Sequence, residues 1–300
     1  MTVDAAHENA RRRVAELPIW ARPVEPEPLG GGISNRNFLV DDGKRKVVAR
    51  VGGDKIVHGV LRASEHAASR AAHAAGVSPA VVHSAPDVLV LDFVEGTTLK
   101  PEDVRDPRYL DRLVDIVRRC HRDIPKHLRG PAAMFWVFHV LRDYAHTLRE
   151  GGSSHTSRLP DLIARAERLE QAVGPIDVVF GHNDLLAANF IDDGQRLWLF
   201  DWEYSGFNSP LFDLGGLASN SEFPPELADE LLARYFGRAP DDGLHLRAAA
   251  MTAASLLRET MWSMVSEIHS ELAFDYSAYT AENLARFETA YGHYLTLDRS

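Results

Sequence analysis

The sequence predicts an α+β fold of two lobes, a small antiparallel-sheet lobe followed by a larger, mainly helical lobe. In the first hundred residues the apolar runs are short and separated by turn signals, which is typical of antiparallel strands. Beyond residue 96 the pattern becomes mainly helical. The 300 residues, 45% of them hydrophobic, can bury the core that such a fold needs. We place the boundary after residue 95, so that the lobes comprise residues 1–95 and 96–300.

The first lobe opens with a charged helix and a proline-rich stretch, residues 18–28, that leads into three glycines. Regular structure is expected to start there. The apolar runs 38–40 and 47–51 are separated by the sequence DDGK, a turn signal that predicts a β-hairpin.

A helix and a buried strand complete this lobe. Residues 64–75 are expected to form the helix, with Ser64 as its N-cap and Gly76 as its stop. The run VLVLDF, residues 88–93, is continuously apolar enough for a buried strand, and the sequence EGT that follows breaks it.

The second lobe is expected to be helical on both sides of a polar segment. The expected helices cover residues 101–124, 133–150 and 161–173, and helices resume after residue 211. Two short apolar runs, 177–180 and 197–200, bracket the densest polar cluster of the chain.

Composition excludes several classes of protein. The formal net charge is -10 and no run of Lys or Arg could follow a nucleic-acid backbone, so we expect no nucleic-acid partner. No segment supplies about 18 uninterrupted apolar residues and the amino terminus lacks an apolar signal region, so we expect no membrane insertion and a cytoplasmic location. Cys120 is the only cysteine, which rules out an intrachain disulfide. A homodimer is compatible with the sequence.

The polar segment contains the residues that phosphoryl transfer requires. Asp184 and Asn189 lie in one loop, and Asp201 follows the next apolar run. Magnesium prefers carboxylate, amide and water oxygens, which Asn189 and Asp201 can supply. An acceptor hydroxyl needs a carboxylate to orient it and to take its proton, and Asp184 can fill that role.

Each of these residues alone would be read as an ordinary loop residue that makes turns and caps. The combination H-x-D-x-x-x-x-N followed by a strand that ends in Asp is the arrangement of protein-kinase catalytic loops, and it favours the functional interpretation. Glu203 is a candidate ligand of a second metal ion, or a residue that lies behind the ligands of the first metal ion. We expect His182 to be a buried residue that braces the loop.

The segments HNDLLAANF and LFDWEYSGFNSPLFDLG resemble the choline/ethanolamine kinase branch of the aminoglycoside phosphotransferase-like superfamily. The resemblance extends over most of the chain and implies a bilobal, protein-kinase-like fold that uses ATP and Mg²⁺. It implies that Asp184 is the catalytic base and that Asp201 binds magnesium. Asp213 matches a later family position that is expected to tie down the catalytic loop.

The nucleotide site is expected in the first lobe. The glycine-rich turn could be only a tight turn or could let backbone N–H groups approach phosphates, and the resemblance favours a loop over ATP. Arg50 and Glu65 could form a surface ion pair or the pair that positions phosphates. The resemblance also implies that residues 91–94 form a hinge against adenine. The predicted nucleotide contacts are Gly31, Gly32, Ser34, Asn35, Arg50, Glu65, Asp92 and Phe93.

The acceptor site is expected in the helical lobe. Trp262 and Tyr279 could be core residues or could form aromatic walls for a cation, with Tyr204 as a third wall. The resemblance favours the cation site, because family members carry a matching W-S motif and a downstream F-x-Y-x-x-Y motif. Glu259 departs from relatives that have a second Trp there, and a carboxylate could bind a primary ammonium or add negative charge near choline.

Together these observations predict an ATP- and Mg²⁺-dependent kinase that phosphorylates the hydroxyl of a small cationic amino alcohol, choline or ethanolamine first. One alternative keeps this chemistry with an aminoglycoside, thiamine or another amino alcohol as acceptor. Another is a nucleotide-binding pseudoenzyme without turnover. The intact set of Asp184, Asn189 and Asp201 argues against the pseudoenzyme.

Overall fold

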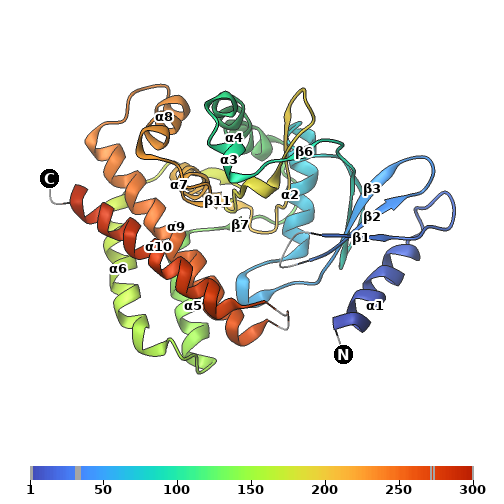
Figure 1. The fold of residues 1–300 in the computed structure, drawn as a ribbon, viewed down its shortest axis with the longest axis horizontal. Helices are drawn as coiled ribbons and strands as arrows, with labels where there is room; N and C mark the ends of the chain where they lie inside the picture. The colour runs from blue at the N-terminus through green and yellow to red at the C-terminus, as the bar shows by residue number, and fades with distance from the viewer. Residues whose placement is uncertain (1–2, 31–34, 271, 273, 299–300) are drawn as a thin grey trace.

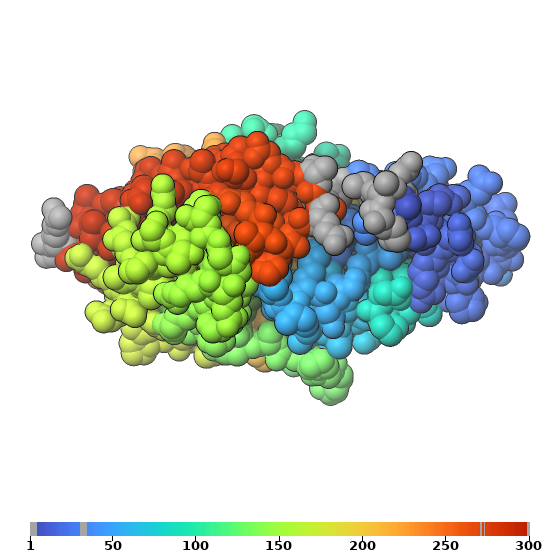
Figure 2. Space-filling view, turned by 90° about the horizontal axis from the view of Figure 1, so that it is seen from below, coloured from blue at the N-terminus to red at the C-terminus, as the bar shows by residue number. Residues whose placement is uncertain are grey.

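The computed structural model describes residues 3–30, 35–270, 272 and 274–298. It has a strand-rich part and a larger helical part that lie side by side (Figure 1), so the predicted α+β organisation is confirmed. In the space-filling view the strand-rich part, in blue, occupies one end of the molecule and the helices occupy the other (Figure 2). The boundary after residue 95 stays a proposal.

The strand-rich part is one antiparallel sheet with the strand order β1-β2-β3-β5-β4. Its strands are β1 (Glu27–Leu29), β2 (Arg36–Asp41), β3 (Lys46–Val51), β4 (Val81–Ala85) and β5 (Val88–Asp92). The predicted hairpin is β2–β3, and the predicted buried strand is β5, which pairs with β3 in the middle of the sheet. Helix α1 (Val3–Ala15) packs Ala10 and Val14 against the apolar side chains of these strands. The hairpin places Arg50 near the end of β3.

Helix α2 (Arg62–Ala74) begins two residues before the predicted start, so the prediction of Ser64 as N-cap is wrong. Leu61 is the N-cap residue and has no capping side chain. The carboxylate of Asp54 instead accepts a hydrogen bond from the N–H of Arg62 at 2.7 Å. This long-range cap has no signature in the local sequence. Gly76 follows the helix end with a positive φ of 68°, as its predicted stop role requires.

The helical part contains eight α-helices among the described residues, namely α3 (Pro101–Val104), α4 (Pro107–His127), α5 (Val137–Glu150), α6 (Leu159–Val173), α7 (Pro210–Asn220), α8 (Pro225–Phe236), α9 (Asp242–His269) and α10 (Tyr276–Leu297). The prediction of one helix over 101–124 is wrong. Asp106 caps α4 by accepting from the N–H of Arg108, and Pro107 is its first residue, so a new helix starts there.

The predicted start of the helix over 133–150 is also wrong. Residues 133 and 134 form strand β7 (Ala133–Met134), which pairs in parallel with β11 (Gly206–Asn208), and β11 pairs on its other side with β8 (Val179–Gly181). A two-residue strand is defined only by its distant partner. A second small sheet joins β6 (Thr97–Thr98), β9 (Phe190–Asp192) and β10 (Leu197–Leu199).

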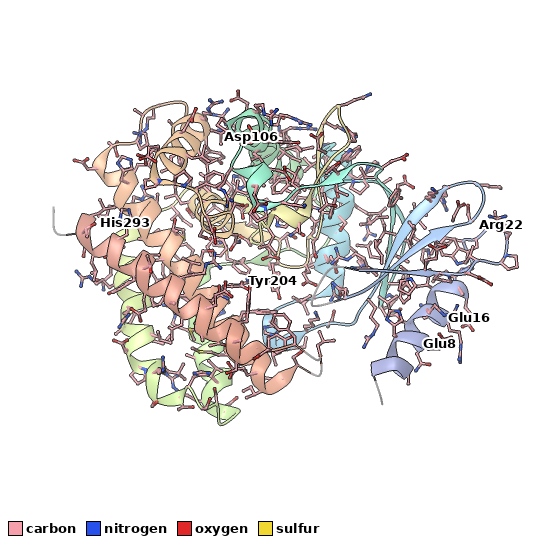
Figure 3. The ribbon with its side chains drawn as sticks, in the orientation of Figure 1. Glu8, Glu16, Arg22, Asp106, Tyr204 and His293 are labelled. Atoms are coloured by element: carbon pink, nitrogen blue, oxygen red, sulfur yellow. The ribbon has the colours of Figure 1, made fainter. Side chains whose placement is uncertain are left out.

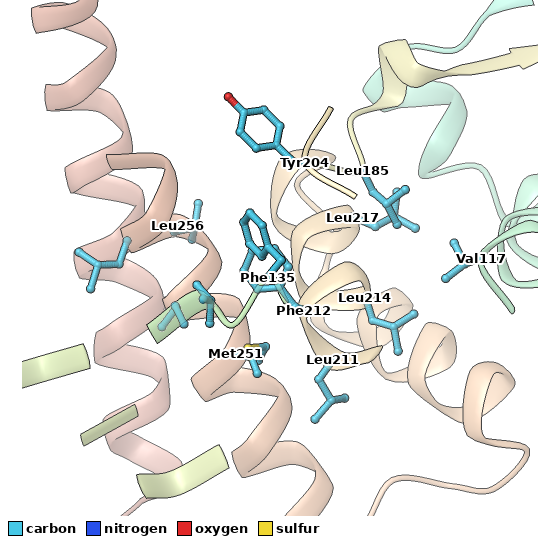
Figure 4. Close-up of a cluster of buried hydrophobic side chains, with 14 of the residues drawn as sticks. Val117, Phe135, Leu185, Tyr204, Leu211, Phe212, Leu214, Leu217, Met251 and Leu256 are labelled. Carbon is cyan, nitrogen blue, oxygen red and sulfur yellow. The ribbon is translucent and has the colours of Figure 1, made fainter. Parts of the chain in front are cut away.

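Helix α9 is the centre of the helical part and packs against α5, α6, α7 and α10. Figure 4 shows apolar side chains of α7 between Val117 of α4 and Met251 of α9. This packing fixes α7 and α9 relative to the loop that follows β8. Because buried apolar area is the main stabilising term, the core holds both helices rigidly beneath that loop.

The structure bears on the single cysteine and on membrane insertion. Cys120 is buried on α4, and burial raises the pKa of its thiol well above the usual value, as expected for a core residue. Within the described ranges, no helix combines the length and the apolar character that crossing a bilayer would require.

Candidate active site

The loop between β8 and β9 is held by buried polar contacts. Asp213 on α7 is 2% exposed and accepts hydrogen bonds from the N–H groups of His182, at 2.8 Å, and Asn183, at 2.7 Å. Burial alone would raise the pKa of Asp213, but the hydrogen bond and charge of His121 outweigh it, so its pKa is lowered. Asn183 has a positive φ of 63°, an uncommon conformation that these contacts sustain. The predicted role of Asp213 in tying down the loop is confirmed.

His182 braces the same loop, as predicted. Its Nε2 lies 3.0 Å from the carbonyl of Phe200 and therefore donates, while Nδ1 accepts from the N–H of Asp184 at 3.3 Å. The imidazole is fully buried, and burial lowers its pKa, which agrees with this neutral tautomer. Both ring nitrogens are engaged by the backbone, so the side chain links the residue before Asp201 to Asp184.

Asp184 and Asn189 stand at the two ends of this loop. The Asn189 side-chain N–H donates to the backbone carbonyl of Asp184 at 2.9 Å, a contact that uses the amide nitrogen and not the amide oxygen. Desolvation raises the pKa of the Asp184 carboxyl well above its usual value. Arg258 opposes this effect, and Glu259 adds to it.

Asp201 lies next to Asn189, because the N–H of Phe200 donates to the carbonyl of Asn189 at 3.2 Å. Its φ of 73° is the second uncommon conformation at this site. One carboxylate oxygen accepts from Arg50 at 2.6 Å. Among the described residues no three His, Cys, Asp or Glu side chains gather as a metal cage. The amide oxygen of Asn189 and the carboxylate of Asp201 are the kinds of donor that Mg²⁺ takes, and Mg²⁺ keeps several waters and uses few protein ligands.

A cluster of charges joins the two parts of the molecule beside Asp201. The predicted pair of Arg50 and Glu65 is present, with Nη2 and Oε1 3.4 Å apart, but Asp201 is nearer to the same guanidinium. Burial alone would lower the pKa of Arg50, whereas the carboxylates of Asp201, Glu65 and Glu203 raise it. Arg50 is therefore a fixed cation at the point where β3 meets the loop.

Arg62 is a second cation of this cluster, which the sequence analysis missed. Its Nη1 contacts Glu65 at 2.5 Å and Glu203 at 3.2 Å, and its Nη2 donates to the Asn35 side chain at 2.8 Å. Asn35 in turn donates to Glu203 at 3.0 Å. Two arginines, three carboxylates and one amide thus meet here. Glu203 lies behind Asp201 and is engaged by Arg62 and Asn35.

The structure describes two of the remaining predicted nucleotide residues, Asp92 and Phe93. Gly31, Gly32 and Ser34 lie outside the described residues. The N–H of Asp92 donates to the carbonyl of Ala80 at 2.9 Å, and that of Phe93 donates to the carbonyl of Lys46 at 3.1 Å. These two N–H groups are therefore engaged within the sheet region, and an adenine would have to use other groups of residues 91–94.

The four predicted acceptor residues come together. The Trp262 indole N–H donates to the Tyr204 hydroxyl at 2.9 Å, and the Trp262 and Tyr279 rings lie 6.4 Å apart, edge to face. The Tyr279 hydroxyl donates to Glu259 at 2.8 Å. Figure 3 shows Tyr204 in the middle of the molecule, and in Figure 4 its hydroxyl points away from the apolar cluster. These contacts set the orientation of both rings.

Two further residues in this region escaped the sequence analysis. Arg258 covers one face of the Tyr204 ring, with its Cζ 4.3 Å from the ring centroid. Residues three or four positions apart lie on the same face of a helix, so Arg258 lies on the same face of α9 as Trp262. This spacing is the sequence signal that points to Arg258. His58, from the first 95 residues, stacks beside Trp262 with ring centroids 5.2 Å apart. No local pattern marks His58, because its partners are distant in the sequence: Tyr144 is 86 residues away and Ser266 is 208 residues away.

His58 makes stability depend on pH. Desolvation, assisted by the charges of Arg258 and Lys55, lowers its pKa to about 3. Since the unfolded chain binds this proton near pH 6.5, the stabilisation is complete above that pH and is lost as pH falls toward 3. Between pH 7.5 and pH 5.5 the unfolding free energy of the wild type should therefore fall by about 1 kcal/mol more than that of His58→Gln.

Urea unfolding of the wild type and of His58→Gln at the two pH values measures this difference. His146→Gln serves as the control, because His146 lies on α5 with its side chain 67% exposed. Equal pH dependence in the wild type and in His58→Gln would show that folding does not lower the pKa of His58.

The model of the phosphotransferase enzyme family (APH) matches residues 25–246. Ethanolamine kinase 2 of Mus musculus is 26% identical over 304 aligned residues, which cover 90% of this chain and 78% of the relative.

Solved structures share the fold. The crystal structure of a choline/ethanolamine kinase family protein from Mesorhizobium loti has a TM-score of 0.77 and 28% identity, covering 97% of this chain and 98% of that one. The choline kinase LicA from Streptococcus pneumoniae has a TM-score of 0.75 over 95% of this chain and 99% of its own. At 20% identity that second likeness concerns the fold alone.

Proposed function

Because this chain belongs to the phosphotransferase enzyme family and is a small-molecule kinase, we propose that it transfers the γ-phosphoryl group of ATP to the hydroxyl of a small cationic amino alcohol, choline or ethanolamine. The observation that carries this proposal is the meeting of two groups of residues. Asn189, which lies beside Asp201, donates to the backbone carbonyl of Asp184 at 2.9 Å. The carboxylate of Asp184 lies 3.9 Å from Arg258, and Arg258 pairs with Glu259, which accepts a hydrogen bond from Tyr279.

Asp184 is the proposed catalytic carboxylate. It would orient the acceptor hydroxyl and take its proton as the bond to phosphorus forms. The contacts of Asp213 and His182 with its loop hold it in place without occupying its carboxylate.

Asn189 and Asp201 are the proposed magnesium ligands. Bound Mg²⁺ would neutralise negative charge on the phosphates of ATP. Arg50, which contacts Asp201 in this structure, and Glu65 are proposed to set the position of those phosphates. Asn35, Asp92 and Phe93 remain proposed nucleotide contacts, as do the glycine-rich residues outside the described ranges.

The acceptor is proposed to bind against the rings of Trp262 and Tyr279. A quaternary ammonium has no N–H to donate and is attracted to aromatic faces, whereas a primary ammonium can also donate hydrogen bonds to a carboxylate. Both Glu259 oxygens already accept hydrogen bonds, from Arg258 at 2.9 Å and from Tyr279 at 2.8 Å. This arrangement favours aromatic recognition of the cation over direct capture by Glu259.

A substrate panel tests the proposal. The purified protein is assayed for magnesium-dependent consumption of ATP with choline, ethanolamine, its methylated forms, thiamine and an aminoglycoside. The highest kcat/KM is expected with choline or ethanolamine. Preference for thiamine or an aminoglycoside would overturn the acceptor while retaining the kinase chemistry, and ATP binding without turnover of any acceptor would favour the pseudoenzyme.

Trp262→Ala should raise KM for the cationic acceptor about tenfold, because a cation–π contact contributes about 1–2 kcal/mol in a desolvated site. KM for ATP should stay within about twofold. Steady-state kinetics with each substrate varied in turn measure both constants.

Trp136→Phe is the matched control, since Trp136 also donates its indole N–H to a side chain, Glu170, but lies outside the site. If the acceptor KM is unchanged in Trp262→Ala, Trp262 does not bind the acceptor and its role is only structural.

A further inference from the structure

Arg258 is a buried cation at the junction of the two groups of site residues. It lies on α9, is 3% exposed, and stacks its guanidinium over the ring of Tyr204. Its Nη1 is 2.9 Å from Glu259 and 3.9 Å from the carboxylate of Asp184. One side chain therefore contacts the acceptor region and faces the proposed catalytic carboxylate.

The guanidinium is not fully used by the chain. Nε and Nη2 of Arg258 are buried and have no hydrogen-bond partner among the described residues. Arg258 also lines a cavity of about 10 Å³ together with Asp184, Asn220 and Ser255. A buried N–H group without a partner costs free energy, so these nitrogens are suited to a water molecule or a substrate oxygen that enters beside Asp184.

Arg258 reaches the acceptor wall through its neighbour. Glu259 accepts from Arg258 on one oxygen and from the Tyr279 hydroxyl on the other. The Tyr204 ring lies under the guanidinium and its hydroxyl accepts from Trp262. Arg258 is thus connected to Tyr279 through Glu259. It is connected to Trp262 through Tyr204.

We propose that Arg258 is a positioning residue for phosphoryl transfer, which holds the carboxylate of Asp184 in register with the acceptor wall formed by Trp262 and Tyr279. The inference rests on the proposed function. Without the guanidinium, the carboxylate of Asp184 would lose the rigid, stacked group that it faces at 3.9 Å, and its orientation toward the acceptor hydroxyl would no longer be fixed.

The geometry requires arginine rather than any cation. A planar guanidinium can stack on the Tyr204 ring and still direct N–H groups toward the carboxylates at its edge, whereas an ammonium is a compact point charge. Lysine should therefore keep the charge balance and lose the fixed orientation.

The experiment compares Arg258→Met and Arg258→Lys with the wild type, using kcat, both KM values and the melting temperature. Arg258→Met should lower kcat about 100-fold, because a misplacement of about 1 Å costs that much, while KM for ATP changes less than about threefold. Arg258→Lys should lower kcat about tenfold at a melting temperature near that of the wild type. A wild-type kcat in the folded variants would overturn the proposal, and Arg258→Lys alone decides it if Arg258→Met does not fold.

A double variant separates positioning from simple charge balance. Arg258→Met with Glu259→Gln removes both charges, and its kcat should remain as low as that of Arg258→Met. Recovery to within about threefold of the wild type would show that Arg258 only neutralises Glu259, which also overturns the proposal.

Arg165→Met is the matched control. Arg165 also lies over a tyrosine ring, that of Tyr291 at 5.2 Å, and pairs with a carboxylate, Glu288 at 2.7 Å. It lies on α6 and both partners lie on α10, outside the site. Its substitution should lower the melting temperature without lowering kcat.

Failure of the proposed function gives a different result. If the wild type phosphorylates neither choline nor ethanolamine, the function is wrong, and the variants are compared with whichever acceptor of the panel is used. If none is used, they are compared on the slow magnesium-dependent hydrolysis of ATP, in which water replaces the acceptor. The wild type should again be fastest, Arg258→Lys slower and Arg258→Met slowest. Equal rates in Arg258→Met and the wild type would overturn the role of Arg258.

Discussion

Asp184→Asn is expected to lower kcat by about three orders of magnitude while ATP binding changes less than about threefold. The amide has nearly the same shape as the carboxylate but cannot accept the hydroxyl proton. The loop should keep its conformation, because Asp213 and His182 hold it through backbone groups rather than through the Asp184 carboxylate. Steady-state kinetics and a direct titration with ATP separate the two quantities.

Asp184→Glu is the companion variant, since it keeps the carboxylate and displaces it by one methylene group. It should lose less activity than Asp184→Asn. If Asp184→Asn turned over at the wild-type rate, another group would have to accept the proton and the proposed role of Asp184 would be wrong.

Asp201→Asn is expected to lower kcat at least 100-fold and to raise the magnesium concentration for half-maximal activity about tenfold. An amide is a weaker ligand for Mg²⁺ than a carboxylate, and the variant also loses the charge that pairs with Arg50 at 2.6 Å. Activity measured against magnesium concentration at fixed ATP gives both values.

Asp192→Asn is a close control for this prediction. Asp192 pairs with Arg112 at the same distance of 2.6 Å, near the surface and outside the site. Its substitution should cost some stability and leave the magnesium dependence as in the wild type. A wild-type magnesium curve in Asp201→Asn would remove Asp201 from the metal site.

The proposed catalytic loop could be read from the sequence because the residues proposed for its chemistry lie in one short segment. Asp184 and Asn189 are five positions apart, and the strand before Asp201 returns beside them as an antiparallel neighbour of β9. Phosphoryl transfer requires particular side chains at a particular spacing, so this pattern can be recognised in the sequence without a structure. The family membership followed from the same segments, and the α+β organisation followed from the change of pattern near residue 96.

Element boundaries were less predictable where a distant partner sets them. The start of α2 depends on Asp54, eight residues before Arg62, and strand β7 exists only because β11 lies beside it. Local periodicity carries no information on either contact, which is why Ser64 and residues 133–134 were assigned wrongly.

The sequence by itself determined the family, the two-part fold and the order of polar residues along the loop, because each depends on local patterns of side chains. Only the tertiary structure decided which charges meet. It brings Arg62 to Glu203 across 141 residues, His58 to Trp262, and Arg258 to the vicinity of Asp184. Electrostatic and packing contacts depend on distance in space, and in a protein of two packed parts that distance is set by the arrangement of helices and strands rather than by separation along the chain.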